Sequence, residues 1–160
     1  MLSLRPAKAE DENFLFQVYE STRSLELSYM ALNPAQKQQF LQMQYKSQRG
    51  SYQNQCPDAE YQVIELDEVP IGRLIVERNQ EAIHLVDISL LTHYRNLGHG
   101  SSLIRKLQDE ARVTGKPRRL YVEKMSPARS LYERMGFRTT RTKDFYLSME
   151  WLPFVAVSHA

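Results

Sequence analysis

The sequence predicts an α+β protein built on one central, twisted mixed sheet of about seven strands, with helices on both faces. Short apolar runs with the two-residue period of strands are interspersed with longer runs of helical period. The expected element order, β-α-α-β-β-β-α-β-α-β-β, is not a strict βαβ alternation. Such an order favours a sheet that mixes parallel and antiparallel strands. A chain of 160 residues suits a single domain over residues 1–160.

The composition is that of a globular protein and argues against several classes of partner. Hydrophobic residues make up 42% and charged residues 25% of the chain, which is ordinary for a soluble domain. The net charge of +2 is not clustered, so nothing indicates nucleic-acid binding. No apolar run approaches the roughly 20 residues that span a bilayer, and no signal peptide is evident. The single cysteine, Cys56, cannot build a metal site alone. We therefore expect a cytoplasmic protein without a metal or a membrane partner.

Caps and breakers delimit the elements of the first half of the chain. Leu2 and Leu4 alternate with polar residues, and Pro6 ends a short edge strand. Asn33 and Pro34 form a helix N-cap followed by a proline in the first turn. The expected order is a strand ending at Pro6, a helix over 7–23, a second helix from 33 to about 47, a polar loop over 49–57, and a strand over 61–66.

The second half repeats the pattern with more apolar strands. Gly115, Lys116 and Pro117 end one helix, and Gly136 ends the next as a C′ residue. The strand over 83–91 is apolar enough for a central position. The expected order is a strand over 71–77 that pairs with 61–66, a strand over 83–91, a helix over 98–114, a strand over 119–123, a helix over 126–136, and strands over 137–141 and 145–152.

A glycine-rich joint lies between the apolar strand and the helix that follows it. Arg95, Gly98 and Gly100 form the pattern Arg-x-x-Gly-x-Gly. Glycines let another molecule approach the main chain, and the free N–H groups at a helix start favour phosphate. A Walker loop would need a lysine after Gly100, and a Rossmann fingerprint would need a glycine at Leu103. A turn without a ligand is the alternative.

This joint resembles the acyl-CoA pyrophosphate loop of the GNAT superfamily of N-acetyltransferases. A second stretch, residues 120–137, is similar to the same family in its strand, its capped helix and its Leu-Tyr-Glu-x-x-Gly-Phe ending. Two motifs at the right separation in a matching element order support each other. The resemblance implies the acyl-CoA N-acyltransferase fold, acetyl-CoA as cosubstrate, and an amine acceptor.

The resemblance also implies where acetyl-CoA binds. The backbone of Leu90 and Leu91 would meet the pantetheine arm. Ser126 stands where the family usually has an asparagine that touches this arm, and serine is shorter. Backbone N–H groups of the joint would hold the pyrophosphate. These groups belong to Arg95, Asn96, Leu97, Gly98, His99, Gly100 and Ser101.

Acetyl transfer to an amine needs a base and an acid. An alkyl amine with a pKa near ~10.4 is protonated at neutral pH, and the leaving thiolate needs a proton or other stabilisation. The resemblance implies Tyr132 as the general acid. Asp87 is the candidate base, and a buried structural carboxylate bonded to backbone N–H groups is the alternative reading. Glu26, His84 and His93 are weaker candidates for the base.

We therefore expect an enzyme that moves the acetyl group of acetyl-CoA directly to a primary amine of a small molecule or peptide, within a ternary complex. The alternative is a non-catalytic acyl-CoA-binding or sensing module on the same fold. The sequence leaves open the identity of the acceptor and whether the chain forms a homodimer. Arg118 and Arg119 are expected at a solvated strand edge, where they could meet the 3′-phosphate of CoA.

Overall fold

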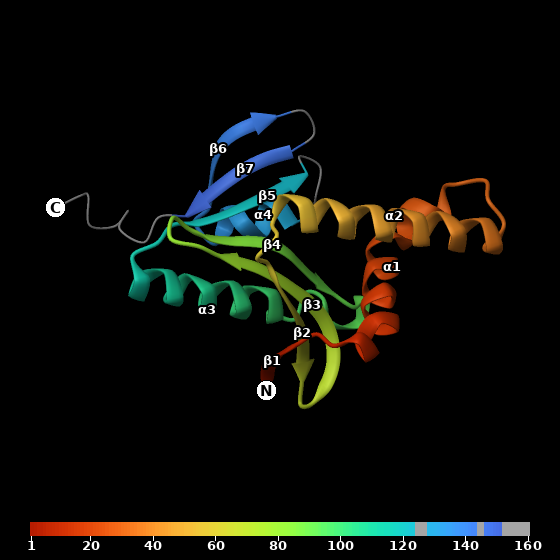
Figure 1. Ribbon diagram of the computed structural model, residues 1–160, viewed down its shortest axis with the longest axis horizontal. Coiled ribbons are helices and arrows are strands. Elements are labelled where there is room, and N and C mark those ends of the chain that lie inside the picture. Colours follow the sequence, from red (N-terminus) through yellow and green to blue (C-terminus); the bar gives the residue numbers. More distant parts are fainter. Residues whose placement is uncertain (124–127, 144–145, 152–160) are drawn as a thin grey trace. The chain divides into compact units, whose positions relative to one another are not determined.

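In a computed structural model, which describes residues 1–123, 128–143 and 146–151, the elements follow the predicted order (Figure 1). The strands are β1 (Leu2–Pro6), β2 (Glu60–Leu66), β3 (Val69–Arg78), β4 (Ile83–Leu90), β5 (Arg118–Glu123), β6 (Arg138–Lys143) and β7 (Tyr146–Trp151). The α-helices are α1 (Glu12–Ser28), α2 (Pro34–Gln55), α3 (His99–Thr114) and α4 (Ala128–Arg134). Short 3₁₀ turns are η1 (Ala9–Asp11) and η2 (Thr92–Tyr94).

The strands form one mixed sheet in the order β1-β2-β3-β4-β5-β7-β6. Strand β1 runs antiparallel to β2, with Leu2 opposite Leu66. Strand β4 runs parallel to β5 from the pair Ile83–Arg118 to the pair Leu85–Leu120. Strand β7 is antiparallel to both β5 and β6. The predicted mixed α+β sheet is confirmed.

The chain divides into two compact units that share strands β3 and β4. The first unit comprises residues 1–75 and 87–95, and the second comprises residues 76–86 and 96–160. A single domain over 1–160 stays a prediction. Among the described residues, every helix is too short or too polar to cross a membrane.

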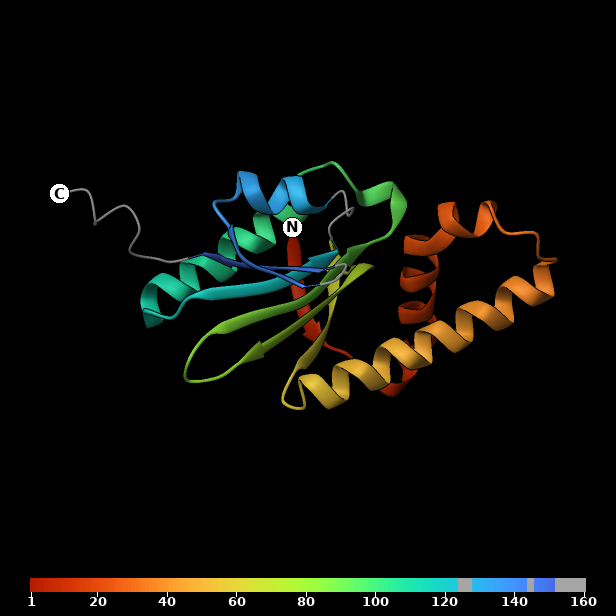
Figure 2. The same ribbon diagram turned by 90° about the horizontal axis from the view of Figure 1, so that it is seen from above.

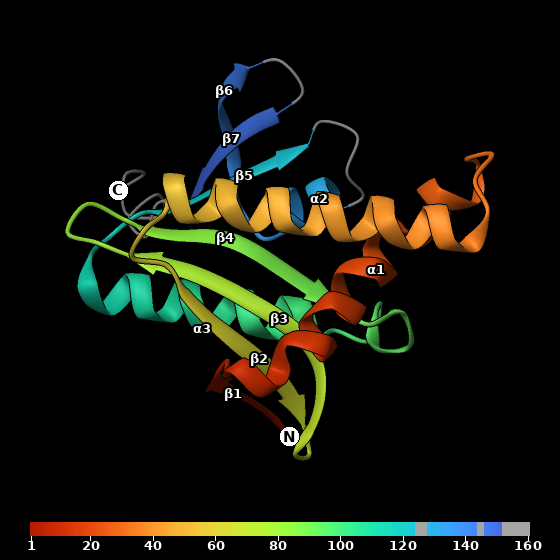
Figure 3. The same cartoon turned by 45° about the vertical axis from the view of Figure 1, so that its right-hand side comes forward.

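The core of the first unit is formed by residues of α1, α2 and β2, and α1 crosses α2 at a wide angle (Figures 2 and 3). The ring of Tyr45 meets Phe16 edge-on, with 5.4 Å between ring centroids, and lies at the same distance from Tyr19. Aromatic pairs in this geometry contribute about 0.5–1.5 kcal/mol beyond burial. The buried residues of this cluster are Leu15, Tyr19, Leu27, Leu41, Tyr45 and Val63.

Helix α2 is longer than predicted, and the polar loop expected over 49–57 is wrong for most of its length. The helix continues to Gln55, and the N–H of Cys56 donates to the carbonyl of Tyr52 at 2.7 Å. Gly50 inside the helix costs about 1 kcal/mol relative to alanine. The neighbouring Arg49 forms an ion pair with Glu12 of α1, a contact that a sequence pattern within α2 does not reveal.

In the second unit, α3 buries the face that its periodicity predicts, Leu103, Ile104, Leu107 and Ala111. The expectation of a solvated edge is wrong for Arg118, which is fully buried. Strand alternation places Arg118 on the same face as the buried Leu120. Its guanidinium lies 5.6 Å from the ring centroid of Phe137 and donates to the carbonyl of Ile104 at 3.3 Å. Burial lowers the pKa of Arg118 to about 10.

Candidate functional site

The joint before α3 is a turn whose backbone N–H groups lead into the helix. Asn96 and Gly98 have φ angles of 62° and 87°, in the left-handed region. Gly98 is the N-cap of α3 and supplies no side-chain cap. The N–H of Ser102 donates to the carbonyl of Gly98 at 3.0 Å. The amides of residues 99–101 therefore precede the first intrahelical bond, at the positive end of the helix dipole.

The two glycines of the joint have different reasons to be glycines. Gly98 needs its positive φ, and nothing lies within 4 Å of the position of a Cβ. Gly100 has no positive φ, and a Cβ there would lie 3.8 Å from Cδ2 of Leu131, an ordinary contact. Neither backbone strain nor packing against the described residues requires glycine at position 100. A bare main chain does allow another molecule to approach it closely.

Arg95 forms hydrogen bonds within the first unit through both its side chain and its backbone. Its Nε donates to the carbonyl of Leu90 at 2.8 Å, and a terminal nitrogen donates to Oγ of Ser21 at 3.2 Å. Its backbone N–H donates to the carbonyl of Thr92 at 3.3 Å. The side chain of Arg95 thus braces the end of β4 against α1.

The end of β4 is half-buried, from Val86 to Leu90, and lies close to the backbone of β3. A Cβ on Gly72 would lie 2.3 Å from the carbonyl oxygen of Ser89. The N–H of Leu91 donates to the carbonyl of Ile71 at 2.8 Å, and its carbonyl accepts from the N–H of Tyr94 at 2.9 Å. Both backbone polar groups of Leu91 therefore have hydrogen-bond partners within the chain.

Asp87 lies on β4, and its carboxylate accepts hydrogen bonds from side chains. The alternative prediction, a buried structural carboxylate, had backbone N–H groups as the donors. The guanidinium of Arg73 approaches Oδ2 of Asp87 through two nitrogens, Nη2 at 2.8 Å and Nε at 3.0 Å. The hydroxyl of Ser89 donates to the same oxygen at 3.0 Å. Burial opposes the charge on Arg73, yet its pKa is raised, because Asp87 favours the cation.

Arg73 was not predicted as a site residue. The signal was present, because this arginine interrupts the apolar run from Ile71 to Val76, and a buried charge needs a partner. Choosing Asp87 as that partner requires the register between β3 and β4, which local periodicity does not give.

Tyr132, the candidate acid, lies on α4 in the second unit and is buried. Its ring meets Phe137 edge-on, with 5.9 Å between centroids. Its carbonyl accepts the N–H groups of Met135 and Phe137 at 3.1 and 3.0 Å. These bonds close the end of α4, as the predicted Gly136 stop requires. Ser126 lies outside the described residues.

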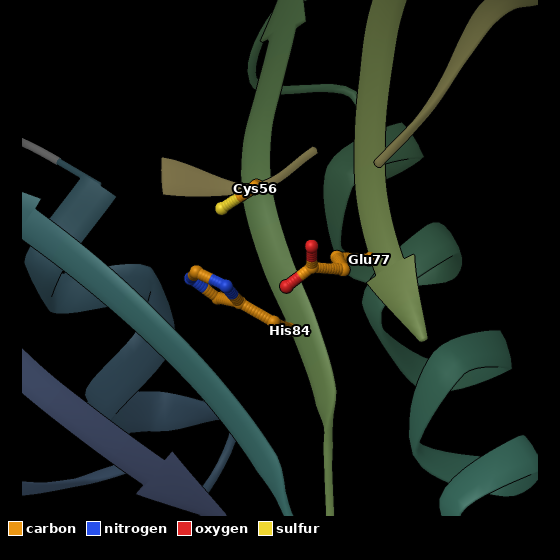
Figure 4. Close-up of side chains that lie close together, drawn as sticks. All are labelled: Cys56, Glu77 and His84. Atoms are coloured by element: carbon orange, nitrogen blue, oxygen red, sulfur yellow. The ribbon is translucent and has the colours of Figure 1, made fainter. Parts of the chain in front are cut away.

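The weaker base candidates differ in their surroundings. Glu26 forms an exposed ion pair with Arg23 at 3.3 Å, and His93 is exposed in η2. His84 is half-buried; burial lowers its pKa, and the charges of Arg119 and Arg118 lower it further. Figure 4 shows His84 on β4 beside Glu77 on β3, with a ligand atom of each within 4.8 Å of the other.

Comparisons with solved structures show the same fold at low sequence identity. PaiA N-acetyltransferase from Thermoplasma acidophilum, solved with coenzyme A, is 19% identical with a TM-score of 0.70, covering 95% of this chain and 99% of that one. Ribosomal-protein-S18-alanine N-acetyltransferase from Escherichia coli is 18% identical with a TM-score of 0.62, covering 95% and 94%. A GNAT acetyltransferase from Elizabethkingia anophelis with acetyl-CoA bound is 12% identical with a TM-score of 0.59, covering 94% and 97%.

Sequence comparisons give one clear result. No curated protein sequence matches this chain. The family model described as the acetyltransferase (GNAT) family matches residues 22–137, which is more than half of the chain. This range includes the glycine joint and the stretch that ends at Phe137. The chain therefore belongs to the GNAT acetyltransferase family.

Proposed function

We propose that this protein moves the acetyl group of acetyl-CoA directly to a primary amine of a small molecule or peptide, within a ternary complex in the cytoplasm. Family membership supports acetyl transfer. Solved relatives with coenzyme A or acetyl-CoA bound support this cosubstrate. The observation that carries the proposal is Gly100, where neither backbone strain nor packing against the described residues requires a glycine.

The diphosphate of acetyl-CoA is held by main-chain N–H groups at the start of α3. Amides before the first intrahelical bond, together with the helix dipole, favour a diphosphate. The groups proposed to bind it belong to Asn96, Leu97, Gly98, His99, Gly100 and Ser101, with Arg95 as the preceding brace. Leu90, Leu91 and Ser126 are proposed to meet the pantetheine arm.

The chemistry needs two proton transfers. The amine nitrogen attacks the thioester carbonyl; the C–N bond forms and the C–S bond then breaks. Asp87 takes the proton from the amine, and Tyr132 gives a proton to the departing sulfur. A backbone N–H near Leu90 stabilises the oxyanion. The products are an amide and the free thiol of CoA, and the thiol is what an assay detects.

The test has two steps. Calorimetry with acetyl-CoA measures binding, and thiol release across a panel of amines measures transfer. Amine-dependent thiol release with intersecting initial-velocity lines supports direct transfer in a ternary complex. Binding without thiol release to any amine would favour the sensing module. Absence of binding would overturn the proposal.

A further inference from the structure

In the part-buried ion pair between Arg73 and Asp87, the two oxygens of the carboxylate differ in their hydrogen-bond partners. All three side-chain contacts described above fall on Oδ2: two from Arg73 and one from Ser89. No described residue donates a hydrogen bond to Oδ1. The side chain of Asp87 is 18% exposed, whereas that of Arg73 is 5% exposed. The carboxylate is therefore anchored through Oδ2, and part of the side chain remains exposed.

Arg73 is itself held in place. Its terminal nitrogen Nη2 also donates to Oε1 of Gln48 on α2 at 3.3 Å. Other titratable groups acting on the pair within the first unit are Tyr45 and Tyr52 of α2 and Tyr61 of β2. A guanidinium with partners on two elements has little freedom, so it fixes the orientation of the carboxylate that it grips.

Stability alone is a weak reason for this arrangement. Replacing a buried ion pair with apolar residues of similar volume is often neutral or stabilising, because both charges must be desolvated. The pair also lies where β4 becomes half-buried, three residues before Leu90. A site that must hold one oxygen of a carboxylate in a set direction needs such a clamp.

We infer that Arg73 is a positioning residue, which grips Oδ2 of Asp87 and leaves Oδ1 to accept the N–H of the acceptor amine. This inference rests on the proposed function and deepens it by assigning the atom that meets the acceptor. The proton of the amine moves to Oδ1 as the nitrogen lone pair forms the C–N bond and the C–S bond breaks. The acceptor must therefore present a nitrogen that carries at least one hydrogen.

The variant Arg73→Lys tests the clamp while keeping the charge. One ammonium cannot reproduce the approach of Nε and Nη2, so the carboxylate loses its fixed direction. We expect kcat to fall about tenfold or more, since small misplacements in a reacting site are costly. The dissociation constant of CoA and the KM for acetyl-CoA stay within about twofold, because the side-chain partners of Arg73 are Asp87 and Gln48, which are not among the residues proposed to bind CoA. Ser89→Ala changes kcat in the same direction by less.

A matched control is Arg5→Lys, which alters another arginine that grips a carboxylate, Asp11, through two nitrogens. This control lowers the melting temperature and leaves kcat unchanged. Arg73→Met removes both the charge and the two contacts with Oδ2, so kcat falls further than in Arg73→Lys.

The outcomes separate the inference from the proposed function. If the wild type releases thiol with amines and folded Arg73→Lys keeps the wild-type kcat and acceptor KM, the positioning role is wrong while the proposed function stands. If the wild type binds CoA and no amine gives thiol release, the proposed function fails and this inference fails with it. Loss of stability with an unchanged kcat in the folded variant would mark a purely structural pair.

Discussion

Replacement of Gly100 by alanine should separate folding from cosubstrate binding. The added Cβ would lie 3.8 Å from Leu131, and the backbone there has no positive φ. Alanine is favoured over glycine in a helix by up to about 1 kcal/mol. The free energy of unfolding should therefore rise by about 0.5–1 kcal/mol, or roughly 1–4 °C in melting temperature.

Binding of CoA should move in the opposite direction. The methyl group occupies space that a diphosphate needs when it approaches the main chain, so the dissociation constant should rise about tenfold, or ~1.4 kcal/mol. Thermal melts measure the first effect, and calorimetry with CoA measures the second. A more stable variant that binds CoA as tightly as the wild type would refute the assignment of this turn.

Two other glycines serve as controls for this experiment. Gly50→Ala lies inside α2 with nothing within 4 Å, so it should gain stability without any change in CoA binding. Gly98→Ala must adopt a φ of 87°, which costs about 1–2 kcal/mol for an L-residue, so it should lose stability. Only Gly100→Ala should combine a stability gain with weaker binding.

Three further predictions follow from other contacts. Gly72→Ala places a Cβ 2.3 Å from the carbonyl oxygen of Ser89, so chemical denaturation should show a loss of about 3 kcal/mol; a loss below about 1 kcal/mol would contradict the close approach. Arg5 lowers the pKa of Asp11 from 3.8 to about 2, so Asp11→Asn should destabilise the protein above about pH 4. The difference in free energy of unfolding between variant and wild type should shrink as pH falls toward 2; a difference independent of pH would argue against the ion pair. Tyr132→Phe keeps the ring contact with Phe137 but removes the hydroxyl, so kcat at saturating substrate should fall about 100-fold; an unchanged kcat in the folded variant would remove Tyr132 from the acid role.

Local patterns in the sequence were sufficient for the element order and the hairpin over 61–77. The caps at Asn33 and Gly136 also mark real helix ends, since Asn33 accepts from the N–H of Gln36 at 2.8 Å. These features depend on neighbours in the chain, and periodicity reports them well.

Features that depend on distant residues were not predicted. Helix α2 continues past Gly50, and Arg49 in this turn pairs with Glu12, a residue 37 positions earlier. Arg118 is buried because α3 covers its face of β5, so its charge gave a misleading signal. The glycine joint could be located from the sequence, whereas the partner of Asp87 required a strand register that no local pattern encodes.

Helix α2 has a consequence for how this protein can diverge. Of its 22 residues only Leu41 and Tyr45 are buried, so most of its positions tolerate exchange at little thermodynamic cost. Substitutions can therefore accumulate along this helix during evolution while α1 and the sheet keep their packing. A saturation-mutagenesis map should show a permissive α2 with two intolerant positions, and relatives with different acceptors should vary most in this segment.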